Sequence, residues 1–294
     1  MARNSRWPSR IFYKTKNILI EKLEKQSNIE VLKERNFFAK IFSAKKIPDI
    51  YFHSGSLDDD SKENILNSKI TIVNSFAAMN EIIARTKISH EKIKVIYPSI
   101  EVEYKDPKEI KVKICEELQI DNESKIIFFT AKNIKSSGVK EFLDICSSLN
   151  YQNFKVIIAG NNKQIYNLRF QIPKYPNLEN RLILLEDYKN IDELFLAADI
   201  FILPTYNKSF SSNILKAMFC ECVVFVTIEN DVREVVDVFA SMDSSTDPSI
   251  AFKIDAILLS EQDFNQIKKQ NRELAFEFTL ENNLAKINHI IENV

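Results

Sequence analysis

Residues 197–205 read Ala197-Ala198-Asp199-Ile200-Phe201-Ile202-Leu203-Pro204-Thr205, and this stretch decides the fold class. Its centre is a short apolar run without the polar alternation of a strand that has one face in water. Such runs are typical of parallel sheets with helices on both faces, and the proline marks the end of the strand. The stretch therefore predicts a buried strand of an α/β fold.

The same kind of strand recurs on both sides of this stretch, with a helical pattern between each pair. Sheets built this way are parallel and doubly wound, because each strand needs a helical crossover to reach the next. We predict a complete Rossmann-like domain over residues 124–276, with strands at 126–130, 155–159, 182–185, 200–203 and 223–227 and helices at 139–149, 163–170, 191–198 and 213–220.

The first hundred residues show this alternation more weakly. Three strands are few for a doubly wound domain, so we predict a shortened N-terminal α/β domain over residues 1–100. We expect helical spacing over about 18–44, strands at 47–53, 69–75 and 93–97, a helix between the last two strands, a linker over 101–123 with a short helix near 111–118, and a final helix within 277–294.

Composition excludes several classes of function. The formal net charge is -1, so nothing global favours a nucleic-acid partner. The amino terminus has no uninterrupted apolar stretch and no apolar run approaches about 18 residues, which favours a cytoplasmic protein without a membrane span. Cys220 and Cys222 have no histidine near them in the sequence, so we predict that they pack in the core and hold no metal.

Residues 1–23 form a basic and aromatic leader that runs into an apolar group. Arg3, Arg6 and Arg10 are interleaved with Trp7 and Phe12, and no acidic residue occurs before residue 21. Such a segment can lie peripherally on an anionic membrane at the inner face of the cell membrane. A solvated amino-terminal extension explains the composition equally well.

In doubly wound sheets, ligands bind outside the carboxyl ends of the strands. The residues that follow the predicted strands of the second domain are therefore the candidate ligand site. They fall in five segments: 131–138, 160–162, 186–189, 205–212 and 228–233.

Several motifs in these segments follow one another in a specific order and spacing. They are Phe128-Phe129-Thr130-Ala131-Lys132-Asn133 with Gly138-Val139, Ile157-Ile158-Ala159-Gly160, the stretch 197–205, Ser209-Phe210-Ser211 with Leu215, Ala217 and Met218, and Asp231-Val232-Arg233-Glu234-Val235-Val236. Together they resemble the carboxyl-terminal half of GT-B glycosyltransferases of family 4, which are retaining enzymes that use nucleotide-sugar donors. The forms of the first and fourth motifs are most similar to members that build lipopolysaccharide or other surface glycans.

This resemblance implies a function and a set of site residues. The donor substrate would be a nucleotide-diphosphate sugar, the acceptor a surface glycan or lipid-linked molecule, and no cofactor or metal would be needed. His53 matches a position where the family often has a histidine near donor or acceptor, although a lone histidine after a strand is more often structural. The implied donor-binding residues are Ala131, Lys132, Asn133, Gly138, Gly160, Asn161, Tyr188, Lys208, Ser209, Phe210, Ser211, Ser212 and Lys216.

Four positions depart from the family pattern: Lys208, Lys216, Ser137, where the pattern has a basic residue, and Glu221, where it has glycine. Lys208 and Lys216 stand where active members carry glutamates for the donor sugar and the ribose, and an ammonium group cannot accept hydrogen bonds from hydroxyls. The lysines could compensate as phosphate ligands, or they could be solvated charges of a degenerate site. Two functions therefore stay open: a glycosyltransferase, and a catalytically inactive GT-B-like subunit that binds a partner transferase or a glycan acceptor.

Overall fold

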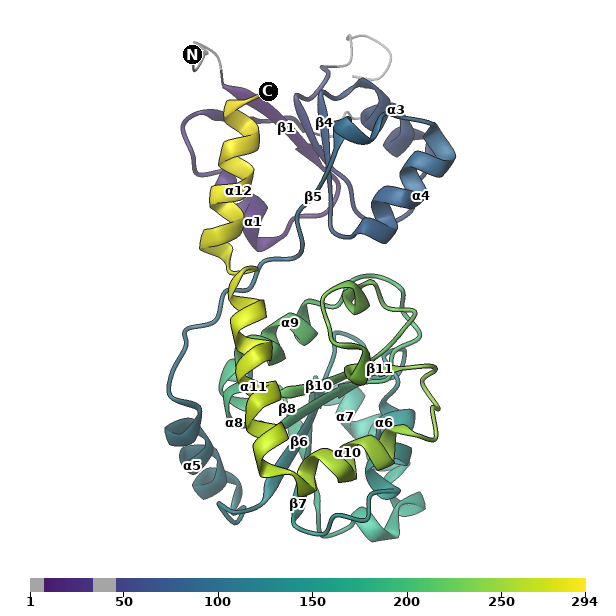
Figure 1. Ribbon diagram of the computed structural model, residues 1–294, viewed down its shortest axis with the longest axis vertical. Coiled ribbons are helices and arrows are strands. Elements are labelled where there is room, and N and C mark those ends of the chain that lie inside the picture. The colour runs from purple at the N-terminus through teal and green to yellow at the C-terminus, as the bar shows by residue number, and fades with distance from the viewer. Residues whose placement is uncertain (1–7, 34–45) are drawn as a thin grey trace. The chain divides into compact units, whose positions relative to one another are not determined.

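The computed structural model describes residues 8–33 and 46–294 (Figure 1). The chain divides into two compact units. The amino-terminal unit comprises Met1–Glu101 together with Phe278–Val294, and the carboxy-terminal unit comprises Val102–Glu277.

The carboxy-terminal unit contains a six-stranded sheet in the order β11-β10-β9-β6-β7-β8, and every strand pair is parallel. The predicted doubly wound fold is confirmed, and each predicted strand lies within two residues of an observed one. The strand order reverses between β6 and β9, which makes their carboxyl ends the switch point of the sheet. The strands are β6 (Lys125–Thr130), β7 (Phe154–Gly160), β8 (Leu182–Glu186), β9 (Ile200–Leu203), β10 (Val223–Thr227) and β11 (Ser241–Met242).

Helices cover both faces of this sheet (Figure 1). Phe128 of β6 packs edge-on against Phe195 of α8, with ring centroids 5.0 Å apart, and both side chains are fully buried. Cys220 and Cys222 are also buried, which confirms their predicted place in the core. The helices are α5 (Pro107–Leu118), α6 (Val139–Ser147), α7 (Asn162–Arg169), α8 (Ile191–Ala197), α9 (Ser212–Phe219), α10 (Ile250–Leu259) and α11 (Glu261–Phe276).

The segment 101–123, expected as a linker, contributes a structural element to the carboxy-terminal unit. Its helix α5 packs along α8, where Lys113 pairs with Glu193, and Lys111 pairs with Asp199 directly before β9, both at 2.7 Å. Because Glu193 and Asp199 are both buried, these lysines satisfy carboxylates that would be costly to leave unpaired.

The amino-terminal unit contains a five-stranded parallel sheet in the order β2-β1-β3-β4-β5. Helices α1 and α12 cover one face, and α3 and α4 cover the other (Figure 1). The elements are β1 (Ser9–Tyr13), α1 (Ile18–Leu23), β2 (Ile29–Val31), β3 (Ile50–Phe52), α3 (Asp59–Asn67), β4 (Ile70–Val73), α4 (Phe76–Thr86), β5 (Ile93–Val95) and α12 (Leu280–Glu292).

The prediction for the first 44 residues is right for the helix α1 and wrong for the strands β1 and β2. Residues 9–13, expected as part of a leader, form the strand β1 between β2 and β3, and α1 ends at Leu23. The strand was missed because its flanks are basic, whereas in the fold Arg10 pairs with Asp49 and Ile11 is fully buried. The unit is thus less shortened than predicted, since five strands are present where three were expected.

The apolar group of residues 18–23 faces the protein core. Leu19, Ile20 and Leu23 are buried in one cluster with Ile287 and Ile291 of the last helix, α12. The interpretation of residues 1–23 as a membrane-facing segment is therefore wrong for α1. Arg3, Arg6 and Trp7 lie outside the described residues. Across residues 8–33 and 46–294, none of the helices has the length and apolarity needed to traverse a bilayer.

Candidate functional site

The candidate site lies at the carboxyl ends of β6 and β9. Gly138, which precedes α6, has φ +87°, a conformation that side chains rarely adopt. A Cβ atom at this position would lie 1.9 Å from the carbonyl oxygen of Pro204, which follows β9. The backbones of the two loops therefore touch, and only glycine permits the contact.

The loop after β6 is also tied to α7. The Gln164 side chain donates to the Lys132 carbonyl at 2.9 Å and accepts from the Ile134 amide at 3.3 Å. Asn161 caps the start of α7 by accepting from the Gln164 amide at 2.9 Å. The structure thus brings Lys132 and Asn161 to the same edge of the sheet through Gln164. No motif in the sequence pointed to Gln164.

Three further predicted residues lie on this edge. The Gly160 carbonyl accepts from the Asp187 amide at 2.9 Å and so joins the ends of β7 and β8. Asn133 accepts from the Ser136 amide at 3.2 Å within its own loop, and Ala131 directly follows β6.

The loop after β9, residues 204–211, lies beside β6. Asn213 of α9 donates to the carbonyl of Thr130, the last residue of β6, at 3.2 Å. Phe210 is buried under the loop, Ser211 is half-buried, and Ser209 and Ser212 are exposed. Lys208 is exposed, and its ammonium group has no partner among the described residues.

Lys216 is not a solvated charge. Its Nζ lies 2.6 Å from Oδ1 of Asp192 on α8 and 5.6 Å from the centroid of the Phe195 ring. Lys216 lies one turn along α9 from Asn213, so the two residues share one face of the helix. Lys216 contacts α8 from this face. Its charge is therefore paired with a carboxylate in a partly exposed ion pair.

Tyr188, one of the implied donor-binding residues, binds α5 through its hydroxyl. The hydroxyl donates to Glu117 of α5 at 3.0 and 3.1 Å. Burial and this neighbouring carboxylate raise the pKa of Tyr188 to about 12. The hydroxyl therefore stays protonated and anchors the β8–α8 loop to α5.

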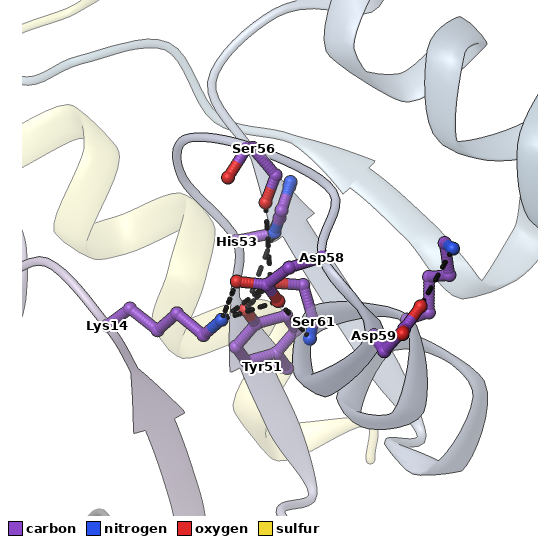
Figure 2. Close-up of polar contacts among 8 residues, drawn as sticks. Lys14, Tyr51, His53, Ser56, Asp58, Asp59 and Ser61 are labelled. Carbon is purple, nitrogen blue, oxygen red and sulfur yellow. Dashed lines mark hydrogen bonds and ion pairs between the residues drawn. The ribbon is translucent and has the colours of Figure 1, made fainter.

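His53 lies in the amino-terminal unit, directly after β3, with only 8% of its surface exposed. Figure 2 shows it beside Tyr51, whose hydroxyl is 3.4 Å from Nδ1, and near the ion pair of Lys14 with Asp58 at 2.7 Å. Burial and the Lys14 charge lower the pKa of His53. The imidazole is therefore neutral at neutral pH and able to accept or donate a hydrogen bond.

The two Rossmann-like units, each with a parallel sheet, have the α/β architecture of GT-B glycosyltransferases. Among solved structures, HepE of Anabaena in complex with UDP has a TM-score of 0.70 and 18% identity, over 83% of this chain and 72% of that one. A glycosyltransferase from Rickettsia africae has a TM-score of 0.72 and 16% identity, over 97% and 90%. WaaG, a glycosyltransferase involved in lipopolysaccharide biosynthesis, has a TM-score of 0.68 and 12% identity, over 96% and 99%.

Residues 111–274, more than half of the chain, match the family of glycosyl transferases group 1, and the chain belongs to this family. The protein is accordingly a glycosyltransferase. No protein of curated function matches its sequence significantly.

Proposed function

We propose that the protein transfers a sugar, with retention of configuration, from a nucleoside-diphosphate donor to a surface glycan or lipid-linked acceptor. The observation that carries the proposal is the contact between the loops after β6 and β9 at the switch point of the carboxy-terminal sheet, since each loop carries an exposed lysine, Lys132 and Lys208. The switch point of a doubly wound sheet is where such folds bind nucleotides.

The chemistry follows from the charges at this edge. As the bond from the anomeric carbon to the β-phosphate oxygen breaks, negative charge grows on the diphosphate. Lys132, Lys208 and the amides of Lys140 and Glu141 in the first turn of α6 are the groups we assign to stabilise it. Lys216 is left out of this role because Asp192 already holds its ammonium group.

The donor and acceptor classes draw support from proteins of the same fold. HepE of Anabaena has been solved with UDP and with UDP-glucose. WaaG acts in lipopolysaccharide biosynthesis. The inactive-subunit alternative loses one of its two supports, because β1 and β2 supply early strands that the sequence seemed to lack.

Isothermal titration with UDP, GDP and ADP tests the proposal. One of the three should bind in the micromolar to low millimolar range. Lys208→Gln should weaken that binding about tenfold, the loss expected for one charge-assisted hydrogen bond of about 1.5 kcal/mol. Lys269→Gln removes an exposed lysine that pairs with Glu273 on α11 and should leave the affinity unchanged. Failure of all three nucleotides to bind at millimolar concentration would refute the donor assignment.

A further inference from the structure

Asn230 lies just beyond β10 and is buried, with 1% of its surface exposed. Its side chain makes four hydrogen bonds to backbone groups. Nδ2 donates to the carbonyls of Asn207 and Ser209, both at 2.8 Å, and Oδ1 accepts from the amides of Ser211 and Val232, both at 3.1 Å. Both donors and both acceptor positions of the carboxamide are therefore used, three of them by the loop after β9.

The rest of this loop is tied to the same segment. The amide of Asp231 donates to the carbonyl of Lys208 at 2.8 Å, and the Thr227 hydroxyl donates to the carbonyl of Thr205 at 2.5 Å. Within the loop, the Asn207 amide donates to the Thr205 hydroxyl and the Ser209 amide to the Asn207 side chain, both at 3.0 Å. The loop backbone is thus held by its neighbours before any ligand arrives.

Two side chains of the loop remain exposed to solvent. Lys208 and Ser209 are exposed although the carbonyls on both sides of Lys208 are bonded to Asn230. A loop of this length without regular structure would otherwise sample many conformations, and ordering it on binding would weaken the affinity. The hydrogen bonds from buried Asn230, here called the clamp, order the loop backbone in advance and so remove that cost. The side chains of Lys208 and Ser209 stay exposed to a ligand.

We propose that Asn230 is a positioning residue that holds the loop 207–211 in the shape that receives the nucleoside diphosphate of the donor. The identity of the ligand in this inference, a nucleoside diphosphate, is taken from the proposed function. Asparagine suits the role because the two carbonyls need donors and the two amides need acceptors. Aspartate has the same shape but supplies no donor, and leucine supplies neither donor nor acceptor.

The test is Asn230→Asp in the full chain, titrated with whichever of UDP, GDP and ADP binds the unaltered protein. If the loop holds the receptive shape in only a fraction of molecules, the apparent dissociation constant rises by the inverse of that fraction. Losing two buried hydrogen bonds predicts a loss of affinity of about 10- to 30-fold. In slow hydrolysis of the matching nucleotide sugar, KM should rise by the same factor. The value of kcat should change less than about threefold, because the bound donor holds the loop in its receptive shape.

Asn283→Asp is the matched control. Asn283 is equally buried, at 1%, and its Nδ2 donates to the carbonyl of Tyr97 and the hydroxyl of Ser99 within the amino-terminal unit. It should lower the melting temperature and leave nucleotide affinity unchanged. Equal affinity of Asn230→Asp and the unaltered protein, or an equal loss in the control, would overturn the inference.

Hydrogen exchange covers the case in which Asn230→Asp does not fold. In the unaltered protein without nucleotide, the amides of Ser211 and Val232 should exchange slowly, since both donate to Asn230. Exchange at the rate of a free peptide would refute the clamp. If those amides are protected but no nucleotide binds, the clamp stands and the proposed donor fails.

Discussion

The two units build parallel sheets of similar design, yet the contacts at the ends of their strands differ. In the carboxy-terminal unit, Gly138 and Pro204 touch through their backbones, and the neutral carboxamide of Asn230 holds the loop after β9. In the amino-terminal unit, Lys14 pairs with Asp58 beyond the carboxyl ends of β1 and β3, and Arg10 pairs with Asp49 at their amino ends. The first kind depends on shape and the second on charge, so the two units should respond differently to glycine substitution and to acid.

Gly138→Ala should show the largest effect and breaks the backbone contact directly. The alanine must adopt φ +87° and place Cβ against the Pro204 carbonyl, which together should cost about 3 kcal/mol. Calorimetric unfolding should show the melting temperature fall by roughly 6–12 °C.

Gly55→Ala is the control in the other unit. Gly55 has φ +84°, but no atom lies within 4 Å of the added Cβ, so only the backbone cost of about 1 kcal/mol remains. Equal destabilisation by the two alanines would mean that the contact with Pro204 contributes nothing.

Asp49→Asn tests the charge-based contacts of the amino-terminal unit. Despite its burial, hydrogen bonds from Arg10 and an ion pair with Lys69 lower the pKa of Asp49 to about 2, from 3.8. A lowered folded-state pKa contributes stability that is present above about pH 4 and is lost as the pH falls toward 2. The variant should lose about 2 kcal/mol at pH 7 and progressively less below pH 4, measured by denaturant unfolding.

Asp59→Asn provides the comparison, because the Asp59 side chain is fully exposed although it pairs with Lys62. The free energy of unfolding of this variant should stay within about 0.5 kcal/mol of that of the unaltered protein, both at pH 7 and below about pH 4. A similar loss from Asp59→Asn would show that the effect at Asp49 is one of general charge and not of its contacts.

Lys216 and Lys208 allow a paired lysine and an exposed lysine of the carboxy-terminal unit to be compared. Lys216→Gln should lower stability by about 0.5–1 kcal/mol, because it breaks a partly exposed pair with Asp192. In a double-mutant cycle with Asp192→Asn, most of that loss should be the coupling energy. Lys208→Gln should leave stability unchanged and reduce only nucleotide affinity. A Lys216 variant without coupling to Asp192 would contradict the assignment.

His53→Gln should show the smallest effect. Burial and Lys14 lower the pKa of His53, so the unfolded chain takes up a proton at higher pH than the folded protein does. Stability from the neutral imidazole is therefore present above about pH 6.5 and falls as the pH decreases below it. Denaturant unfolding between pH 7.5 and 5 should show a smaller slope in this variant, and His289→Gln, at an exposed position, controls for removal of an imidazole. An unchanged slope in His53→Gln would contradict the prediction.

The carboxy-terminal unit was predictable because its signals are local. Continuous apolar strands such as Ile200–Leu203 and the helices between them can be identified within windows of about ten residues. The strand Ser9–Tyr13 was not predictable in this way, because its polar residues find partners such as Asp49 only in the fold. The helix α5 was expected in a linker because nothing local shows its pairing with Glu193, 80 residues away.

The residues of the candidate site also differ in how far local sequence could predict them. Local sequence was enough to predict which loops follow the strands, and so to nominate Lys132, Gly138 and Lys208. It could not show that Lys216 is neutralised by Asp192 or that the Tyr188 hydroxyl binds Glu117, because these partners come from other helices. Asn230 lay within a nominated loop, but its role depends on four backbone groups that only the tertiary fold brings around one carboxamide.

By itself, then, the sequence determined an α/β protein with a ligand-holding parallel sheet, because hydrophobic periodicity and turn residues act over short distances along the chain. Only the tertiary structure decided which charges are free and which are paired, as at Lys208 and Lys216. The physical reason is that an ion pair or a hydrogen bond depends on the distance between atoms in space, and that distance is set by how the sheets and helices pack.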